Sequence, residues 1–139
     1  MPVFMVKADK KSLEEQPSWR IDLQKIYTEG SSEIAQEFIT EKLAEPNSWF
    51  AGALFNDHLL GAVLVTERPD CWLLSHLWVR KVTQRRGVAK RLLELLVIKA
   101  KEQGKYLLVA SFDANPAAEA LLAKLDCIKQ QKNDVQEKP

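Results

Sequence analysis

The sequence has little or none of the features that identify several specialised protein classes. Cysteine occurs only as Cys71 and Cys127, and histidine only as His58 and His76. These counts exclude a disulfide framework and a histidine-rich metal site. No apolar run approaches the ~20 residues that cross a bilayer, and the N-terminus lacks the basic-then-apolar order of a signal peptide. We therefore expect a cytoplasmic protein without a metal and without membrane association.

A charge excess of either sign is also absent. The 139 residues include 20 Lys and Arg against 19 Asp and Glu, which gives a formal net charge of +1, and 46% of the residues are hydrophobic. Nucleic-acid-binding proteins usually have a larger basic excess, so nucleic acid is not an expected partner. The length suits one domain. We expect a single α/β (α+β) domain over residues 1–128 and a polar tail over 129–139.

Changes in hydrophobic period divide the chain into strands and helices. Apolar runs bounded by turn residues predict strands over residues 3–7, 49–55, 59–66, 71–79 and 106–110, with a short edge strand possible after residue 128. Apolar residues at helical spacing predict helices from the N-cap Ser18 to Gly30, between Ser32 and Pro46, from Val88 to the C′ residue Gly104, and from the N-cap Asn115 to Leu125.

The stretch from Leu77 to Lys90, LWVRKVTQRRGVAK, has the clearest chemical signal. A predicted strand ends at Val79, and a predicted helix opens after Gly87. The first N–H groups of a helix have no partner within it and lie at the positive end of its dipole. Arg85 and Arg86 add positive charge there, so the junction suits a diphosphate. Taken alone, the same string also fits a solvated basic helix start with a glycine turn.

The order of strand, loop and helix around this string resembles motif A of the GNAT acetyltransferase fold, which holds acetyl-CoA. The run YLLVA, followed by Asn115 and Ala118 at a helix start, resembles the second motif of that fold. The resemblance covers residues 3 to 128 and implies a central mixed, mostly antiparallel β-sheet flanked by helices. It implies acetyl-CoA or CoA as cofactor, with the backbone of Leu77, Trp78 and Val79 beside the pantetheine arm and Thr83, Gln84, Arg85, Arg86, Gly87, Val88, Ala89 and Lys90 around the diphosphate.

The catalytic pattern of that fold is incomplete in this chain. Aligning on Asn115 and Ala118 puts Leu122 where many GNAT enzymes have the tyrosine that protonates the leaving thiolate. Leucine cannot donate a proton. His76, with Ser75 next to it, is the nearby candidate base, but a single histidine in a strand more often packs or faces solvent. We therefore assign no catalytic residue and keep His76 as the one candidate.

Three strings narrow the resemblance to one GNAT family. RIDLQKIY (Arg20–Tyr27), KVTQRRGVA (Lys81–Ala89) and ALFNDHLLGAV (Ala53–Val63) are similar to the PanM/PanZ-type maturation factors of aspartate 1-decarboxylase. That resemblance implies an acetyl-CoA-binding regulator of pantothenate and CoA biosynthesis. It would promote self-cleavage of the decarboxylase precursor and restrain the mature enzyme when acetyl-CoA is plentiful. It makes aspartate 1-decarboxylase the expected partner and Asn56 and Asp57, at the turn of a hairpin, the expected contacts.

Two other functions stay open on the sequence alone. The first is an N-acetyltransferase acting on a small-molecule or protein amine, which the missing tyrosine disfavours. The second is a purely structural GNAT domain, which the intact Gln84–Ala89 string disfavours. Read alone, RIDLQKIY is an ordinary amphipathic helix, and Asn56 and Asp57 are most simply a turn. The Ser31–Pro46 region also exceeds the compact family pattern.

Overall fold

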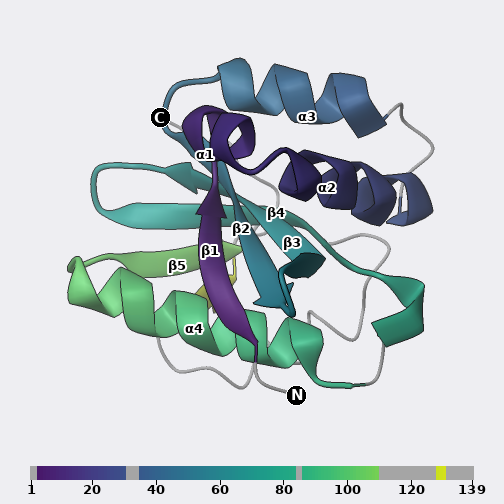
Figure 1. Cartoon of the computed structure of the whole chain (residues 1–139). Coiled ribbons are helices and arrows are strands. Elements are labelled where there is room, and N and C mark those ends of the chain that lie inside the picture. Colours follow the sequence, from purple (N-terminus) through teal and green to yellow (C-terminus); the bar gives the residue numbers. More distant parts are fainter. Residues whose placement is uncertain (1–2, 31–34, 84–85, 110–127, 131–139) are drawn as a thin grey trace.

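The computed structural model describes residues 3–30, 35–83, 86–109 and 128–130, which form a β-sheet with helices on both faces (Figure 1). In chain order the elements are β1 (Phe4–Ala8), α1 (Lys10–Glu15), α2 (Pro17–Gly30), α3 (Ala35–Ala44), β2 (Ser48–Phe55), β3 (His58–Glu67), β4 (Cys71–Val79), the short 3-10 helix η1 (Lys81–Thr83), α4 (Val88–Glu102), β5 (Tyr106–Val109) and β6 (Ile128–Gln130).

The sheet is mixed, and its strands follow their order in the chain, β1-β2-β3-β4-β5-β6. The first four strands pair antiparallel, whereas β4 with β5 and β5 with β6 pair parallel. Parallel neighbours need a crossover, and α4 supplies it between β4 and β5. The expected mixed, mostly antiparallel sheet is confirmed, and β6 is the short edge strand expected after the buried strands.

Both faces of the sheet are covered, by α1, α2 and α3 on one side and by α4 on the other (Figure 1). Side chains of a strand point alternately to the two faces. Accordingly Trp49 and Ala51 of β2 join the core beneath α4, while Phe50 joins the core beneath α2 and α3. This two-sided burial explains why the strands are apolar runs with little polar alternation.

Helix α4 has the bounds and the buried face that its apolar residues predict. Val88, Leu92, Leu96 and Ala100 recur every four residues and are all buried against the sheet. At the end of the helix Gly104 has a φ of 71°. Its N–H donates to the Lys101 carbonyl at 3.0 Å, and the Lys105 N–H donates to the Ala100 carbonyl at 2.9 Å. This is a Schellman motif, so the prediction of Gly104 at C′ is confirmed.

The first helix of the chain, α1, was not among the sequence predictions. Its N-cap Asp9 accepts the Ser12 N–H at 2.9 Å, and the Ser12 hydroxyl accepts the Asp9 N–H at 2.8 Å. This reciprocal capping box fixes a six-residue helix, although Leu13 is its only buried side chain. A helix held by its cap in this way has no apolar repeat for a periodicity argument to find.

The predicted N-cap role of Ser18 is wrong. Helix α2 begins at Pro17, directly after Gln16 ends α1, so Ser18 lies inside the first turn. Proline suits a first helical position because it has no N–H to leave unpaired and its φ is already helical. The Trp19 N–H donates to the Gln16 carbonyl at 3.0 Å, which continues the chain from one helix into the next. The last predicted helix, from Asn115 to Leu125, lies outside the described residues.

Candidate functional site

The start of α4 has the backbone geometry that the sequence predicted for an anion site. Gly87 is the N-cap, with φ 79° and ψ 13°, and no side chain caps the first turn. These angles lie in the left-handed region that glycine adopts without strain. A Cβ atom built on Gly87 would meet nothing within 4 Å, so its surroundings leave open space. The first turn also contains no acidic residue. The first turn of α4 therefore offers amide groups that no side chain caps, and it adds no negative charge of its own.

A tight turn leads from β4 to Gly87. The Arg80 carbonyl accepts both the N–H and the hydroxyl of Thr83, each at 2.9 Å, and the Thr83 carbonyl accepts the Arg86 N–H at 3.2 Å. Thr83 is buried, whereas Arg86 and Val82 are exposed. The Thr83 side chain thus holds the turn itself, and the basic side chain that the described residues place next to Gly87 is Arg86. Gln84 and Arg85, also predicted here, lie outside the described residues.

Glu29, near the end of α2, anchors this turn and was not predicted from the sequence. Its carboxylate accepts the Lys81 N–H at 2.9 Å and the Arg80 Nε–H at 2.9 Å. Partial burial raises the pKa of Glu29, but the hydrogen bonds from Lys81 and Arg80 and their positive charges outweigh it, so the pKa is lowered. The sequence signal was slight, because Glu29 lies just beyond the RIDLQKIY string and its partners are more than fifty residues away.

A β-bulge bends β4 before the residues predicted to lie along the pantetheine arm. Leu64 pairs with Ser75 and Ala62 pairs with Trp78, so His76 and Leu77 together oppose one residue of β3. Within the described part of the chain, the ladder between β4 and β5 runs from Cys71 to Leu74 and stops before the bulge. Bulges bend a strand and interrupt its pairing. Leu77, Trp78 and Val79 therefore lie on a segment of β4 beyond that described ladder.

His76 occupies the bulge itself, with a φ of 56° that is unusual for a residue other than glycine. Its carbonyl accepts the Tyr27 hydroxyl at 2.8 Å, and its ring lies 4.9 Å from the ring of Phe38, centroid to centroid. Its Nδ1 is 3.0 Å from the Ser75 hydroxyl, and the side chain is exposed. These contacts give His76 a packing role at the bulge, and the neutral Ser75 hydroxyl is one of the groups beside its ring.

The predicted hairpin between β2 and β3 is confirmed. Asn56 and Asp57 form its two-residue turn with φ values of 50° and 67°, the signature of a type I′ turn, and both side chains are exposed. Asp22 of α2 contacts the two residues that follow this turn. This carboxylate, in a residue only 5% exposed, accepts the Leu59 N–H at 3.0 Å and lies 3.4 Å from His58 Nδ1.

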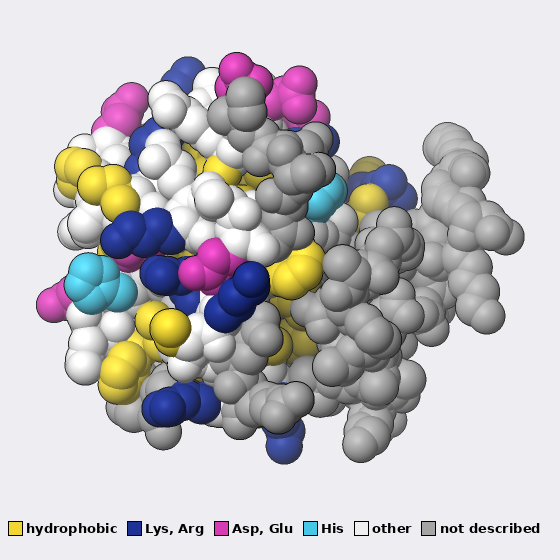
Figure 2. Space-filling view, turned by 90° about the vertical axis from the view of Figure 1, so that its right-hand side faces the viewer, with side chains coloured by type: hydrophobic (Ala, Val, Ile, Leu, Met, Phe, Trp, Pro, Cys, Tyr) yellow, Lys and Arg dark blue, Asp and Glu magenta, His cyan; other side chains and the backbone are white. Residues whose placement is uncertain are grey.

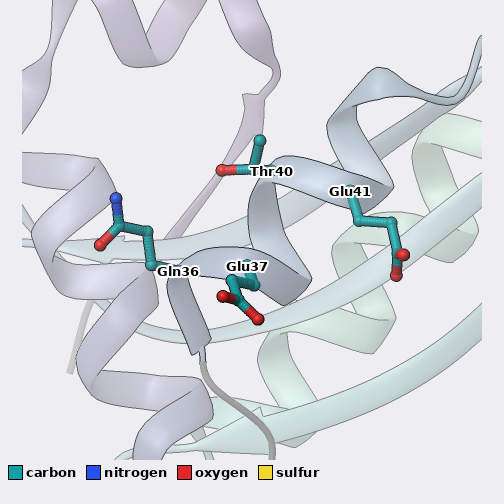
Figure 3. A pocket seen from close by; sticks show the side chains of 4 residues that line it. All are labelled: Gln36, Glu37, Thr40 and Glu41. Atoms are coloured by element: carbon teal, nitrogen blue, oxygen red, sulfur yellow. The ribbon is translucent and has the colours of Figure 1, made fainter.

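A surface hollow lies on α3, away from the start of α4 and on the other side of the sheet from α4. It measures about 460 Å³ and is lined by Gln36, Glu37, Thr40 and Glu41. Figure 3 shows that these four side chains do not converge on one point, and the Thr40 hydroxyl accepts a 2.7 Å hydrogen bond from Arg20. The described residues contain no group of three or more His, Cys, Asp or Glu that could hold a metal ion. No helix in the same part of the chain is long and apolar enough to cross a membrane.

Figure 2 shows the side of the molecule on which the end of α2 and η1 lie. Several Lys and Arg side chains lie on this face, with an Asp or Glu side chain between them and hydrophobic side chains beside them. Ile21 of α2 and Val82 of η1 are the exposed large apolar residues of these two elements, at 53% and 71%. The described part of this face thus shows basic, acidic and hydrophobic side chains together.

Comparison with known proteins identifies the relatives of this chain. The sequence model of a family described as the acetyltransferase (GNAT) domain, PanZ, matches residues 10–131. A curated relative, the PanD regulatory factor of Escherichia coli K12, is 44% identical over 75 residues. That match spans about half of each protein, 54% of this chain and 54% of the relative.

Solved structures give the same fold. The solution NMR structure of Escherichia coli YhhK bound to coenzyme A is 31% identical, covers 88% of each chain and has a TM-score of 0.60. The crystal structure of a ribosomal-protein-alanine N-acetyltransferase from Brucella melitensis biovar Abortus 2308 has a TM-score of 0.73 over 99% of this chain and 98% of that chain. At 14% identity, the latter similarity establishes the fold alone.

Proposed function

The chain belongs to the PanZ family of GNAT acetyltransferase domains, and from this premise we propose that it is an acetyl-CoA-dependent regulator of aspartate 1-decarboxylase (PanD). In this proposal it promotes self-cleavage of the decarboxylase precursor, and it acts in the cytoplasm. The observation that carries the proposal is the match of the PanZ family over residues 10–131, together with the curated relative that regulates PanD. The geometry of two surface features supports it.

The first feature is the start of α4, which we assign to the diphosphate of acetyl-CoA or CoA. The uncapped first turn, the left-handed Gly87 and the exposed Arg86 form a site for a doubly charged group. A relative that is 31% identical was solved bound to coenzyme A. We assign Leu77, Trp78 and Val79 of β4 to the pantetheine arm and Thr83, Gln84, Arg85, Arg86, Gly87, Val88, Ala89 and Lys90 to the diphosphate.

The second feature is the β2–β3 hairpin, which we assign to the decarboxylase. Asn56 and Asp57 stand at its tip and are exposed. The type I′ turn fixes the backbone of both residues, so little backbone ordering is required on binding. An amide and a carboxylate at a fixed position can recognise backbone and basic groups of a partner through hydrogen bonds.

We propose that acetyl transfer by this protein is slow or absent, and we assign it no catalytic residue. The His76 ring packs on Phe38 and lies 3.0 Å from the Ser75 hydroxyl, contacts that are typical of a packed histidine rather than a general base. Leu122, at the position of the tyrosine acid, lies outside the described residues and rests on sequence alone. The alternative is an N-acetyltransferase acting on a small-molecule or protein amine, which the first experiment below separates from regulation.

Precursor cleavage tests the proposed function directly. Purified decarboxylase precursor is incubated alone, with this protein, with acetyl-CoA, and with both, and chain splitting is followed on a denaturing gel. We expect the pair to accelerate cleavage beyond either component alone. Gly87→Glu, which places bulk and negative charge at the diphosphate position, is expected to remove the effect of acetyl-CoA. Equal cleavage rates in all four reactions would exclude a maturation role.

A further inference from the structure

Helix α2 forms side-chain hydrogen bonds to three separate segments of the chain. The Asp22 carboxylate accepts the Leu59 N–H beside the β2–β3 hairpin turn, and the Tyr27 hydroxyl donates to the His76 carbonyl in the β4 bulge. The Glu29 carboxylate accepts the Lys81 N–H in η1. In each case the partner is a backbone group, so the bond fixes the position of the chain there. One helix therefore sets the positions of the hairpin, the bulge and the turn that leads to Gly87.

Asp22 is the buried carboxylate among these three residues. Its residue is 5% exposed, and a buried carboxylate is costly unless hydrogen bonds compensate its lost hydration. The two contacts of its Oδ2 are the Leu59 N–H at 3.0 Å and His58 Nδ1 at 3.4 Å, both in the first residues of β3. A hydrogen bond from an amide to a carboxylate is stronger than one between neutral groups. Asp22 thus ties the end of the hairpin to α2.

Glu29 plays the corresponding part for the turn before α4. Both of its carboxylate oxygens are used, one by the Lys81 N–H and the other by the Arg80 guanidinium. Arg80 also accepts the Thr83 N–H and hydroxyl at its carbonyl, and the Thr83 carbonyl accepts the Arg86 N–H. A chain of short contacts therefore runs from Glu29 to the residue before Gly87.

We propose that α2 is a positioning helix that holds the partner-facing hairpin in register with the cofactor turn, with Asp22 and Glu29 as its positioning residues. The inference rests on the proposed function, which assigns the hairpin to the decarboxylase and the turn to acetyl-CoA. Acetyl-CoA bound at the turn is then coupled to the hairpin through α2 and these hydrogen bonds. By linkage, the factor by which acetyl-CoA strengthens partner binding equals the factor by which the partner strengthens acetyl-CoA binding.

Calorimetric titrations of Asp22→Ala and Glu29→Ala test this assignment. Asp22→Ala is expected to weaken decarboxylase binding about tenfold, the factor that loss of one charged hydrogen bond commonly gives, with acetyl-CoA affinity of the isolated protein unchanged. Glu29→Ala is expected to weaken acetyl-CoA binding with partner affinity in the absence of cofactor unchanged. In both variants the linkage factor is expected to fall toward one.

Conservative variants separate positioning from general damage to the fold. Asp22→Asn keeps an oxygen that can accept the Leu59 N–H, so it is expected to restore most of the partner affinity. Lys25→Ala, at an exposed position of the same helix, is the control and is expected to match the parent. A merely structural role would lower thermal stability while leaving all affinities and the linkage factor unchanged well below the unfolding temperature, and that result would overturn the inference.

Amide hydrogen exchange gives a readout that does not depend on the partner. The Leu59 amide is expected to exchange about tenfold faster in Asp22→Ala, and the Lys81 amide about tenfold faster in Glu29→Ala, since each loses a charged acceptor. The amide of Leu96 in α4 is expected to keep its parent rate. If the parent fails to bind the decarboxylase, the proposed function fails and exchange still tests the positioning bonds. If the parent binds and neither amide changes, the positioning role is overturned.

Discussion

The hydroxyl of Tyr27 in α2 donates a 2.8 Å hydrogen bond to the carbonyl of His76, 49 residues further along the chain. His76 has a φ of 56° in the bulge of β4, so the bond stabilises a backbone conformation that a histidine rarely adopts. Burial raises the pKa of the Tyr27 hydroxyl well above its ordinary value of 10.0, so it remains a donor at neutral pH. The bulge thus depends on a tyrosine from a different element.

Removing that hydroxyl is expected to destabilise the protein without breaking its core. Tyr27→Phe keeps the ring that packs against Phe38 and Phe50 but leaves the His76 carbonyl without this donor. We expect a loss of about 0.5–1.5 kcal/mol in the free energy of unfolding, the net contribution of one hydrogen bond, measured by urea denaturation. A loss below the error of that measurement would mean that the hydrogen bond does not hold the bulge.

Gly87 is expected to be essential for cofactor binding. At a hundredfold excess over the dissociation constant, acetyl-CoA is expected to stabilise the parent by about 2.7 kcal/mol, which is seen as a rise in melting temperature. Gly87→Glu is expected to abolish that rise because its carboxylate repels the diphosphate.

The matched control for this variant is Gly87→Asn. Asparagine tolerates the left-handed backbone better than other side chains, so Gly87→Asn separates the effect of charge from that of backbone strain. It is expected to retain part of the thermal shift. A full shift in Gly87→Glu would place the diphosphate elsewhere.

Acidic pH is expected to weaken the anchor between α2 and η1. The pKa of Glu29 is lowered in the folded protein from its ordinary value of 4.5, so the folded state favours the ionised carboxylate. Its contribution to stability is therefore complete above pH 4.5 and is lost as the pH falls through the lowered pKa. We expect the stability difference between the parent and Glu29→Gln to be constant near neutral pH and to shrink below pH 4.5.

The comparison needs only chemical denaturation of both proteins across a pH series. A difference that grows on acidification would contradict the direction of the Glu29 shift. If the parent and Glu29→Gln have equal stability at every pH, the ion pair with Arg80 adds nothing beyond a neutral hydrogen bond. Many ion pairs at protein surfaces contribute as little.

Acetyl transfer to amines is expected to be negligible. A thiol-release assay with acetyl-CoA and a panel of polyamines, amino acids and peptides measures it. Slow background release, unchanged in His76→Ala, is the expected result because the His76 ring packs on Phe38. Robust turnover that falls more than about a hundredfold in His76→Ala, a loss in the range of general acid–base catalysis, would establish the acetyltransferase alternative.

Local signals in the sequence predicted much of the fold and the turn at the start of α4. The strands from β2 to β5 are apolar runs between turn residues, and α4 has a four-residue apolar repeat that ends at Gly104. The Asn56-Asp57 turn has a type I′ conformation that asparagine and aspartate favour. Each of these depends on neighbours in the chain, so a reading of the sequence could find them.

The anchors of the site could not be predicted in the same way. Asp22 and Leu59 are 37 residues apart, and Glu29 and Lys81 are 52 apart. The first pair joins α2 to the start of β3 and the second joins α2 to η1, each through a backbone N–H, which carries no sequence signal. The RIDLQKIY string therefore read as an amphipathic helix, and the roles of Asp22 and Tyr27 became visible only once α2 was placed against the sheet.

Calorimetric titration of aspartate 1-decarboxylase into this protein, with and without saturating acetyl-CoA, tests the regulator assignment most directly. We expect the parent to bind the decarboxylase more tightly with acetyl-CoA than without it. Asn56→Ala is expected to bind the decarboxylase more weakly than the parent in both conditions. Its affinity for acetyl-CoA is expected to equal that of the parent. The affinity for acetyl-CoA should rise in the complex by the same factor. Absence of binding by the parent protein at saturating acetyl-CoA would contradict the assignment.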